Sequence, residues 1–345
     1  MSKISRKVNI MLFALMALFV WSGSALASYS IIDLGTLAGT TSSKGASINN
    51  LGQVAGTSGT RGFIYSNGAM TDLGTPAVAY TTKSINNSGQ IIGYAYIDNV
   101  LTSFLYSEGT LNTLSIAGQV NAINDKGQMT GQETASSSAI IYNNGTVTNL
   151  GTLGGTMSLG NAINNSGQVA GYSITSSNET HAFLYSNGAM SDLGTFGGSQ
   201  SMAYDINNSG QVVGTFQTSA NETHIFLYNN GIMTELGTGI AYGINDLGQV
   251  VGRASTTSGA FAFLSTNGIM SDLNSLIPAG TGWTLTYAKD INNLGQITGY
   301  GTINGKTHAF LLTPDAAPVP IPAAAWLLGS GLMGLAGVRR RFFRA

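Results

Sequence analysis

Ile206-Asn207-Asn208-Ser209-Gly210-Gln211 is one copy of the phrase that decides the fold of this 345-residue chain. The phrase reads Ile-Asn-(Asn/Asp)-x-Gly-Gln, and an apolar pair and usually Gly follow it. Its seven copies begin at Ile48, Ile85, Ile123, Ile163, Ile206, Ile244 and Ile291. A spacing of about 40 residues is typical of repeat proteins. Residues repeated this often usually build a scaffold, so the phrase predicts architecture rather than an active site.

One full repeat contains four short strand patterns. In the copy that starts at His181 they cover Ala182–Ser186, Ala189–Leu193, Met202–Ile206 and Gln211–Gly214. Asn187-Gly188 between the first two is a strong hairpin signal, because a type I′ turn needs positive φ at both central residues. Asn207 to Gly210 supplies turn residues between the last two. The resulting antiparallel units of four strands indicate β-propeller blades and argue against a parallel β-helix, whose strands share one direction.

The ends of the repeat region predict a closed ring. The first strand pattern, Ile31–Leu34, is of the second type, and the last, His308–Leu312, is of the first type. Together they complete one blade, whereas an open solenoid would need distinct capping repeats. We therefore predict an all-β fold over residues 29–313. It is a seven-bladed β-propeller of four-stranded antiparallel blades, closed by pairing of the N- and C-terminal strands.

Residues 1–27 have the pattern of a secretory signal peptide. A basic start precedes an apolar run from Ile10 to Trp21, and Ala25-Leu26-Ala27 ends the segment. Signal peptidase is expected to cleave before Ser28. The alternative is an uncleaved anchor, but the run is shorter than the ~20 residues that span a bilayer.

The C-terminal end has a second targeting pattern. Residues 314–322 form a Pro-rich linker, and residues 323–345 are expected to form a short transmembrane helix with an Arg-rich tail. The sorting motif consists of Val319, Pro320, Ile321, Pro322 and Ala323, with Arg339, Arg340 and Arg341 after the apolar stretch. Basic residues after such a stretch stay cytoplasmic. Five Gly and Ser residues weaken the helix, so we expect a transient inner-membrane anchor.

Two family resemblances follow from these motifs. The tail resembles the PEP-CTERM sorting signal in its VPxPA variant, with Ile321 where Leu is common. This implies processing by an exosortase-type enzyme at the surface of a Gram-negative bacterium that produces exopolysaccharide. His181-Ala182-Phe183 and His308-Ala309-Phe310, together with the Asp-Leu-Gly-Thr and Ile-Asn phrases, resemble the HAF repeats of bacterial extracellular proteins. That resemblance covers about Ile31 to Leu312 and implies an extracellular location without an established activity.

Charge and cysteine content limit the partners. Only 8% of the residues are charged. The body holds 7 of the 14 basic residues and all 15 acidic ones, so its net charge is 7 − 15 = −8. Such a body disfavours a nucleic acid partner, which requires a basic face. The chain has no cysteine, so no disulfide stabilises it after export.

Repeated polar residues are candidates for chemistry, but structural roles explain them better. His181, His224 and His308 occupy the same repeat position, no carboxylate is spaced with them as a ligand, and we expect no metal site. Carboxylates recur just before a Leu in the second strand at Asp33, Asp72, Asp192, Glu235 and Asp272. A carboxylate ring would bind cations. Thr113 and Asn149 replace the acid in other copies, which favours capping of strand ends by side-chain oxygens.

The remaining expectation concerns function. Connections of variable length gather on one face of a propeller, and binding usually occurs on such loops. We expect a ligand on that face or in the central channel, with Trp283 and Tyr287 of the long connection stacking on sugar rings. The sequence favours an exported, non-catalytic surface or matrix protein that binds exopolysaccharide or another cell-surface component and needs no cofactor. The alternative is a secreted glycan hydrolase or lyase, which would need an acid/base pair peculiar to one or two blades.

Overall fold

The computed structural model describes residues 28–74, 80–256 and 259–315. Within these ranges the chain forms strands and one short 3₁₀ helix, η1 (Leu273–Ser275). The predicted signal peptide, sorting motif and C-terminal helix lie outside the described residues. No helix among the described residues has the length and apolar character needed to cross a membrane.

Antiparallel sheets of four consecutive strands make up most of the fold. The first contains β2 (Ser43–Ile48), β3 (Val54–Ser58), β4 (Arg61–Ser66) and β5 (Ala69–Asp72). The second contains β6 (Tyr80–Ile85), β7 (Ile91–Ile97), β8 (Val100–Ser107) and β9 (Thr110–Thr113). The third contains β10 (Gly118–Ile123), β11 (Met129–Glu133), β12 (Ala139–Asn143) and β13 (Thr146–Asn149).

The copy analysed in the sequence spans the next two units. One sheet contains β14 (Gly154–Ile163), β15 (Val169–Thr175), β16 (Thr180–Ser186) and β17 (Ala189–Gly194). It is followed by β18 (Gln200–Ile206), β19 (Val212–Gln217) and β20 (Thr223–Asn229). The four strands predicted for this copy are confirmed to within three residues at each end. Asn187 and Gly188 both have positive φ, as the predicted turn requires.

A long strand joins two units into one seven-stranded sheet. The remaining members of that sheet are β21 (Ile232–Ile244), β22 (Val250–Thr256), β23 (Gly259–Thr266) and β24 (Ile269–Asp272). The first part of β21 pairs with β20 through Thr238, and its last part pairs with β22 from Gly239 onward. The 13 residues of β21 therefore act as the outer strand of one unit and the inner strand of the next.

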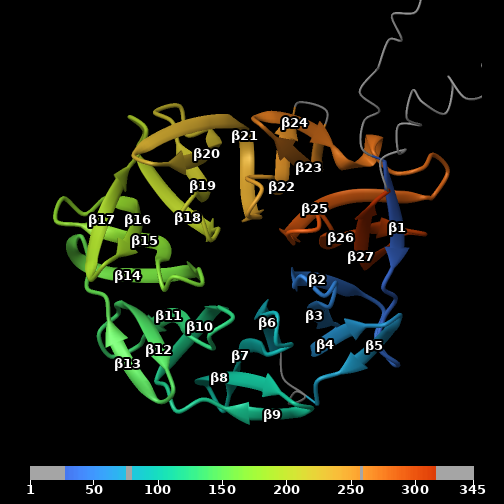
Figure 1. The fold of residues 1–345 in the computed structure, drawn as a ribbon, viewed down its shortest axis with the longest axis horizontal. Coiled ribbons are helices and arrows are strands. Elements are labelled where there is room, and N and C mark those ends of the chain that lie inside the picture. The colour runs from blue at the N-terminus through green and yellow to red at the C-terminus, as the bar shows by residue number, and fades with distance from the viewer. Residues whose placement is uncertain (1–27, 75–79, 257–258, 316–345) are drawn as a thin grey trace, which may run out of the picture. The chain divides into compact units, whose positions relative to one another are not determined.

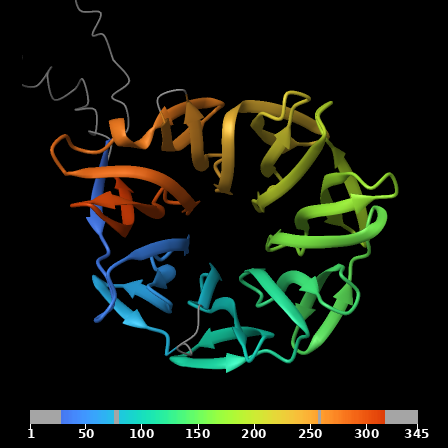
Figure 2. The same ribbon diagram turned by 180° about the vertical axis from the view of Figure 1, so that it is seen from behind.

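The sheets stand side by side around a common centre, in the arrangement of a β-propeller (Figure 1). The first strand of each unit lies innermost, as Figure 2 shows from the opposite face. Strand direction alternates along each unit, so the Ile-Asn turns and the Asn-Gly turns lie at one face. The other connections lie at the opposite face, which we call the variable-loop face.

The two ends of the described chain meet in one sheet. This sheet contains β25 (Trp283–Ile291), β26 (Ile297–Ile303), β27 (Lys306–Pro314) and β1 (Tyr29–Asp33). The β1–β27 pairing is antiparallel and runs from Tyr29 opposite Pro314 to Asp33 opposite Phe310. The N-terminal strand thus completes the last sheet, as the order of the strand patterns predicted.

Both faces of each sheet are buried. Phe183 packs in one apolar cluster, whereas its neighbours Ala182 and Leu184 pack in another. Burying one large apolar side chain in this way stabilises the fold by roughly 1.5–3 kcal/mol. Gly171, in the segment after the repeated phrase, lies against the Leu159 carbonyl and the Phe183 ring, and a Cβ would lie only 1.9 Å from that carbonyl oxygen. The Gly of the phrase therefore makes room for the aromatic residue of the next strand.

Candidate functional site

The Ile-Asn turns surround one mouth of a central channel. In each turn the first Asn organises the loop. Asn207 Oδ1 accepts from the amides of Ser209 and Gln211 at 3.1 and 2.9 Å. Its Nδ2 donates to Gln211 Oε1 at 2.7 Å and also to the carbonyl oxygen of Asn245 at 3.0 Å. The turn chemistry expected from the sequence is present, and the same side chain joins neighbouring units.

These contacts between units close into two rings. Seven bonds run from the Nδ2 of one first Asn to the carbonyl oxygen of the next, and Asn292 to Asn49 completes the circle at 2.9 Å. In a second ring each following residue donates its amide to the side-chain oxygen of its counterpart, closing from Asn293 to Asn50 at 2.8 Å. The cavity at this mouth, about 170 Å³, is therefore framed by asparagines and by Asp125 and Asp246, which already bond one another.

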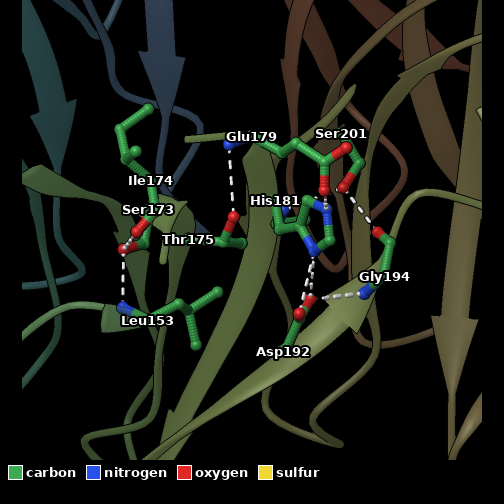
Figure 3. Close-up of polar contacts among 10 residues, drawn as sticks. Leu153, Ser173, Ile174, Thr175, Glu179, His181, Asp192, Gly194 and Ser201 are labelled. Carbon is green, nitrogen blue, oxygen red and sulfur yellow. Dashed lines mark hydrogen bonds and ion pairs between the residues drawn. The ribbon is translucent and has the colours of Figure 1, made fainter. Parts of the chain in front are cut away.

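The carboxylates before Leu belong to the outer part of the blades, away from the channel. Figure 3 shows Asp192 between His181 and Gly194: the His181 Nδ1 lies 2.8 Å from Asp192 Oδ2, and the Gly194 amide donates to Asp192 Oδ1 at 2.7 Å. Asn149 likewise accepts from the amide of Gly151 at 2.8 Å. The predicted capping role is confirmed at these positions.

The same carboxylates also pair with basic side chains, which corrects one expectation. We expected no carboxylate to match the histidines, but His224 and His308 pair with Glu235 and Asp33 at 2.6 and 2.9 Å. The sequence separations, 11 residues for His224 and Glu235 and 275 for His308 and Asp33, hide contacts that arise because the partners lie on paired outer strands. Each pair stays within its own blade, and the described residues contain no cluster of His, Cys, Asp or Glu suited to a metal ion.

Trp283 and Tyr287 lie in a strand, so their predicted loop position is wrong. This segment pairs with β26 from Trp283 opposite Ile303 onward, and the Asn274 side chain also bonds it: its Oδ1 accepts from the Leu285 amide at 2.7 Å and its Nδ2 donates to the Leu285 carbonyl at 3.0 Å. This side chain mimics a strand partner, and β25 begins at Trp283. Trp283 packs edge-on against Phe310, with ring centroids 6.0 Å apart, and contributes to the core.

Tyr287 instead belongs to a run of aromatic rings on the channel side. Tyr204 and Tyr242, on neighbouring inner strands, line a channel cavity of about 110 Å³. Their ring centroids lie 6.3 Å apart, and Tyr287 follows at 6.4 Å from Tyr242. Tyr300 then stacks on Tyr287 at 4.5 Å. We call these four residues the tyrosine track.

Cations accompany the tyrosine track. Lys289 Nζ lies 3.5 Å from the centroid of the Tyr242 ring, and Arg253 lies 5.2 Å from that of Tyr287. Lys44 is placed 5.2 Å from the Tyr300 ring in the same way. These are cation–π distances. The channel wall therefore combines aromatic faces with positive charge.

Two carboxyl groups and a second lysine line the channel cavity beside Lys289. Asp290 Oδ2 accepts from the Ser47 hydroxyl at 2.8 Å and the Ile48 amide at 2.9 Å, across the boundary between units. Asp205 Oδ2 accepts from the Ile244 amide at 2.8 Å in the same manner. Through these hydrogen bonds, each carboxyl group links two neighbouring inner strands.

Burial shifts the ionisation of these groups toward neutrality. It raises the pKa of Asp205 to about 8, helped by repulsion from Asp290. It raises the pKa of Asp290 to about 6, while the bonds from Ile48 and Ser47 oppose the shift. Burial and nearby Lys83 lower the pKa of Lys289 to about 8. Burial of the charged form is the dominant cause in each case.

Sequence reasoning missed this site, although a signal was present. Lys83, Tyr204, Tyr242 and Lys289 each lie two residues before the repeated Ile. The copies disagree at that position, where Ala46 and two asparagines also occur. The turn residues recur in every copy, whereas this position on the inner strand varies.

Comparison with known proteins supports the fold. No family model and no curated protein matches the chain. Among solved structures, streptogramin B lyase shares 12% identity over 84% of this chain and 98% of its own, with a TM-score of 0.51. YCF48 from Cyanidioschyzon merolae shares 12% identity over the same fractions, with a TM-score of 0.50. A gluconolactonase from Xanthomonas campestris shares 10% identity over 85% and 93%, with a TM-score of 0.43. At such identities the likeness to the first two, whose TM-scores reach 0.5, shows only the fold, and the chain is a β-propeller protein.

Proposed function

We propose that this chain is an exported, non-catalytic β-propeller that binds polysaccharide through its central channel on the variable-loop side. The observation that carries this proposal is the tyrosine track. Sugar rings bind proteins through their apolar faces, and aromatic side chains supply matching surfaces. Tyr287 lies four residues before Ile291 on β25, so the track extends from the cavity away from the asparagine rings.

The proposal includes seven blades. When the two parts of β21 are counted as separate strands, the seven-stranded sheet becomes two units of four. The two hydrogen-bonded rings, each with seven members, support this count. The β1–β27 pairing then closes the propeller.

The proposed cellular location rests on the targeting patterns in the two terminal segments. Signal peptidase would release the N-terminus, and an exosortase-type enzyme would process the tail at the surface of a Gram-negative bacterium. Mass measurement of the C-terminal peptide in surface and medium fractions tests this. Loss of residues Arg339 to Arg341 supports processing, and their retention in every fraction contradicts it.

One observation favours the alternative function, a glycan hydrolase or lyase. Asp205, Asp290 and Lys289 line one cavity and have pKa values near neutrality, as acid/base catalysts do. A structural role argues against catalysis. Both oxygens of each carboxyl group accept hydrogen bonds from backbone amides, and these bonds hold each group as a link between strands.

A glycan array with the full-length chain separates the two functions. Binding without release of reducing ends or unsaturated products supports the non-catalytic proposal. Release of such products overturns it in favour of the enzyme. Failure to bind any polysaccharide overturns the binding role itself.

A further inference from the structure

We infer that the polysaccharide is acidic, and that the channel cavity holds the anionic group of one sugar unit. This inference rests on the proposed function and names its ligand class. Four features of the channel carry it: the distribution of cations, the absence of ion pairs between these cations and carboxylates, a buried acceptor without a donor, and the size of the cavity.

The cations of the body are concentrated in the channel. The body has net charge −8, and its 7 basic residues are few. Four of them, Lys44, Lys83, Arg253 and Lys289, lie along the channel wall or against the tyrosine track. The same cavity also holds Asp290 and Asp205. Burial raises the pKa of Asp205 to about 8, so near pH 7 Lys83 and Lys289 face only one ionised carboxylate, and the excess positive charge favours an anion.

These cations do not serve internal ion pairs. Among the described residues, Lys and Arg form one ion pair with a carboxylate, that of Arg61 with Asp72. After burial, repulsion from Lys83 lowers the pKa of Lys289 more than attraction to Asp290 raises it, so this one carboxylate does not offset the second lysine. Arg253 Nε is buried and has no hydrogen-bond acceptor. The channel therefore holds positive charge that a ligand would neutralise.

The cavity also contains an acceptor that lacks a donor. Asn121 is 9% exposed and lines the cavity. Its Nδ2 donates to the Gly160 carbonyl at 3.0 Å, which fixes the amide, and its Oδ1 has no partner. Leaving a buried acceptor unsatisfied costs about 1–3 kcal/mol. A ligand hydroxyl would satisfy it, whereas a simple anion without donors would not.

The size of the cavity limits what enters. About 110 Å³ accommodates several water molecules, and so a carboxylate with an adjoining hydroxyl. Next to it lie the rings of Tyr242, with Lys289 over one face, and of Tyr287, which stacks on Tyr300, so a sugar ring would contact the faces that these neighbours leave. An anionic group, hydroxyl donors and a sugar ring occur together in a uronic acid, present as a chain end or a side group of the polysaccharide.

Calorimetric titration with matched oligosaccharides tests the inference. The probes are short oligomers of galacturonate, glucuronate and mannuronate, each beside its methyl ester, which keeps the ring and hydroxyls but removes the charge. We expect at least one acid to bind about tenfold or more tightly than its ester, with affinity falling as salt rises. Equal binding of acid and ester overturns the acidic ligand and leaves polysaccharide binding intact. Absence of binding to every acid and ester overturns the inference, and the array of neutral polysaccharides then decides the proposed function separately.

Variants locate the effect. Lys289→Gln and Lys83→Gln should each weaken binding of the acid about tenfold and leave the ester unchanged. Lys306→Gln, at the exposed first residue of β27, is the matched control and should bind like the unmodified protein. Thermal melting establishes that each variant is folded. Unchanged acid binding in both folded channel variants contradicts the inference.

Discussion

Asn292 Nδ2 donates a hydrogen bond of 2.9 Å to the carbonyl oxygen of Asn49, 243 residues away in the sequence. It completes a ring of equivalent bonds around one mouth of the channel, and the β1–β27 pairing joins the chain ends at the periphery. The inner and outer parts of the sheets are thus closed by different contacts, neither of them covalent. This arrangement fits a protein without cysteine, whose stability depends on packing and hydrogen bonds.

The inner ring should contribute measurably to stability. Asn292→Asp keeps an oxygen that accepts from Leu294 and Gln296 within the turn, but removes the amide that donates to the Asn49 carbonyl and to Gln296 Oε1. We expect urea denaturation to show a loss of about 1–3 kcal/mol in the free energy of unfolding. Asn304→Asp, in an exposed turn, is the control and should change it by no more than about 0.5 kcal/mol. Equal effects of the two variants would show that the ring bond contributes nothing.

The repeated aromatic residue should be critical for the core. The side chains at this position are fully buried at Phe63, Phe183, Phe226, Phe263 and Phe310. Phe183→Ala leaves a cavity between sheets and should destabilise the protein by about 3–5 kcal/mol. Ile269→Ala, at a side chain that is 72% exposed, should have little effect in the same denaturation experiment. A loss below about 1 kcal/mol for Phe183→Ala would contradict the packing described.

Stability should depend on pH through Asp205. Its folded pKa of about 8 exceeds the usual value of 3.8, so the folded protein holds a proton that the unfolded chain releases between these values. Stability from this group is therefore greatest at low pH and decreases as pH rises from about 4 to about 8. Asp205→Asn removes this ionisation, and its unfolding free energy should decline less over that window than that of the unmodified protein. Parallel curves would show that Asp205 titrates normally.

Stacking on the tyrosine track should require an aromatic ring. Tyr287→Ala removes the face that packs on Tyr300 and should weaken polysaccharide binding about tenfold, a difference of about 1.4 kcal/mol. Tyr287→Phe keeps the ring and should retain most of the affinity. Tyr96→Ala changes an exposed tyrosine, 62% accessible, outside the channel and serves as the control. If all three variants bind alike, the track is not the binding surface.

The repeat pattern predicted the strands, turns and end-to-end pairing because each depends on local signals that recur. Asn187-Gly188 defines its turn through backbone preferences, and the strand order at Ile31–Leu34 defines the closure. Contacts between repeats, in contrast, could not be predicted from local signals. Nothing local indicates that Asn49 faces Asn86, that His308 meets Asp33, or that a side chain such as Asn274 extends a strand.

The channel site was beyond local reasoning for the same reason. Tyr204, Tyr242 and Lys289 are scattered along the sequence and converge only because equivalent inner-strand positions face one centre. Their dissimilarity between copies was the available signal. Differences in length between the repeats placed the predicted site on the variable loops. The chemically most distinctive differences between the repeats lie instead on the inner strands.

The most direct test is the position of a bound acidic oligosaccharide in a crystal structure of the complex. The account predicts a sugar ring against Tyr242 and Tyr287, with its carboxylate toward Lys83 and Lys289. An oligosaccharide bound on the outer strands or at the asparagine rings, with the channel cavity unchanged, would contradict it.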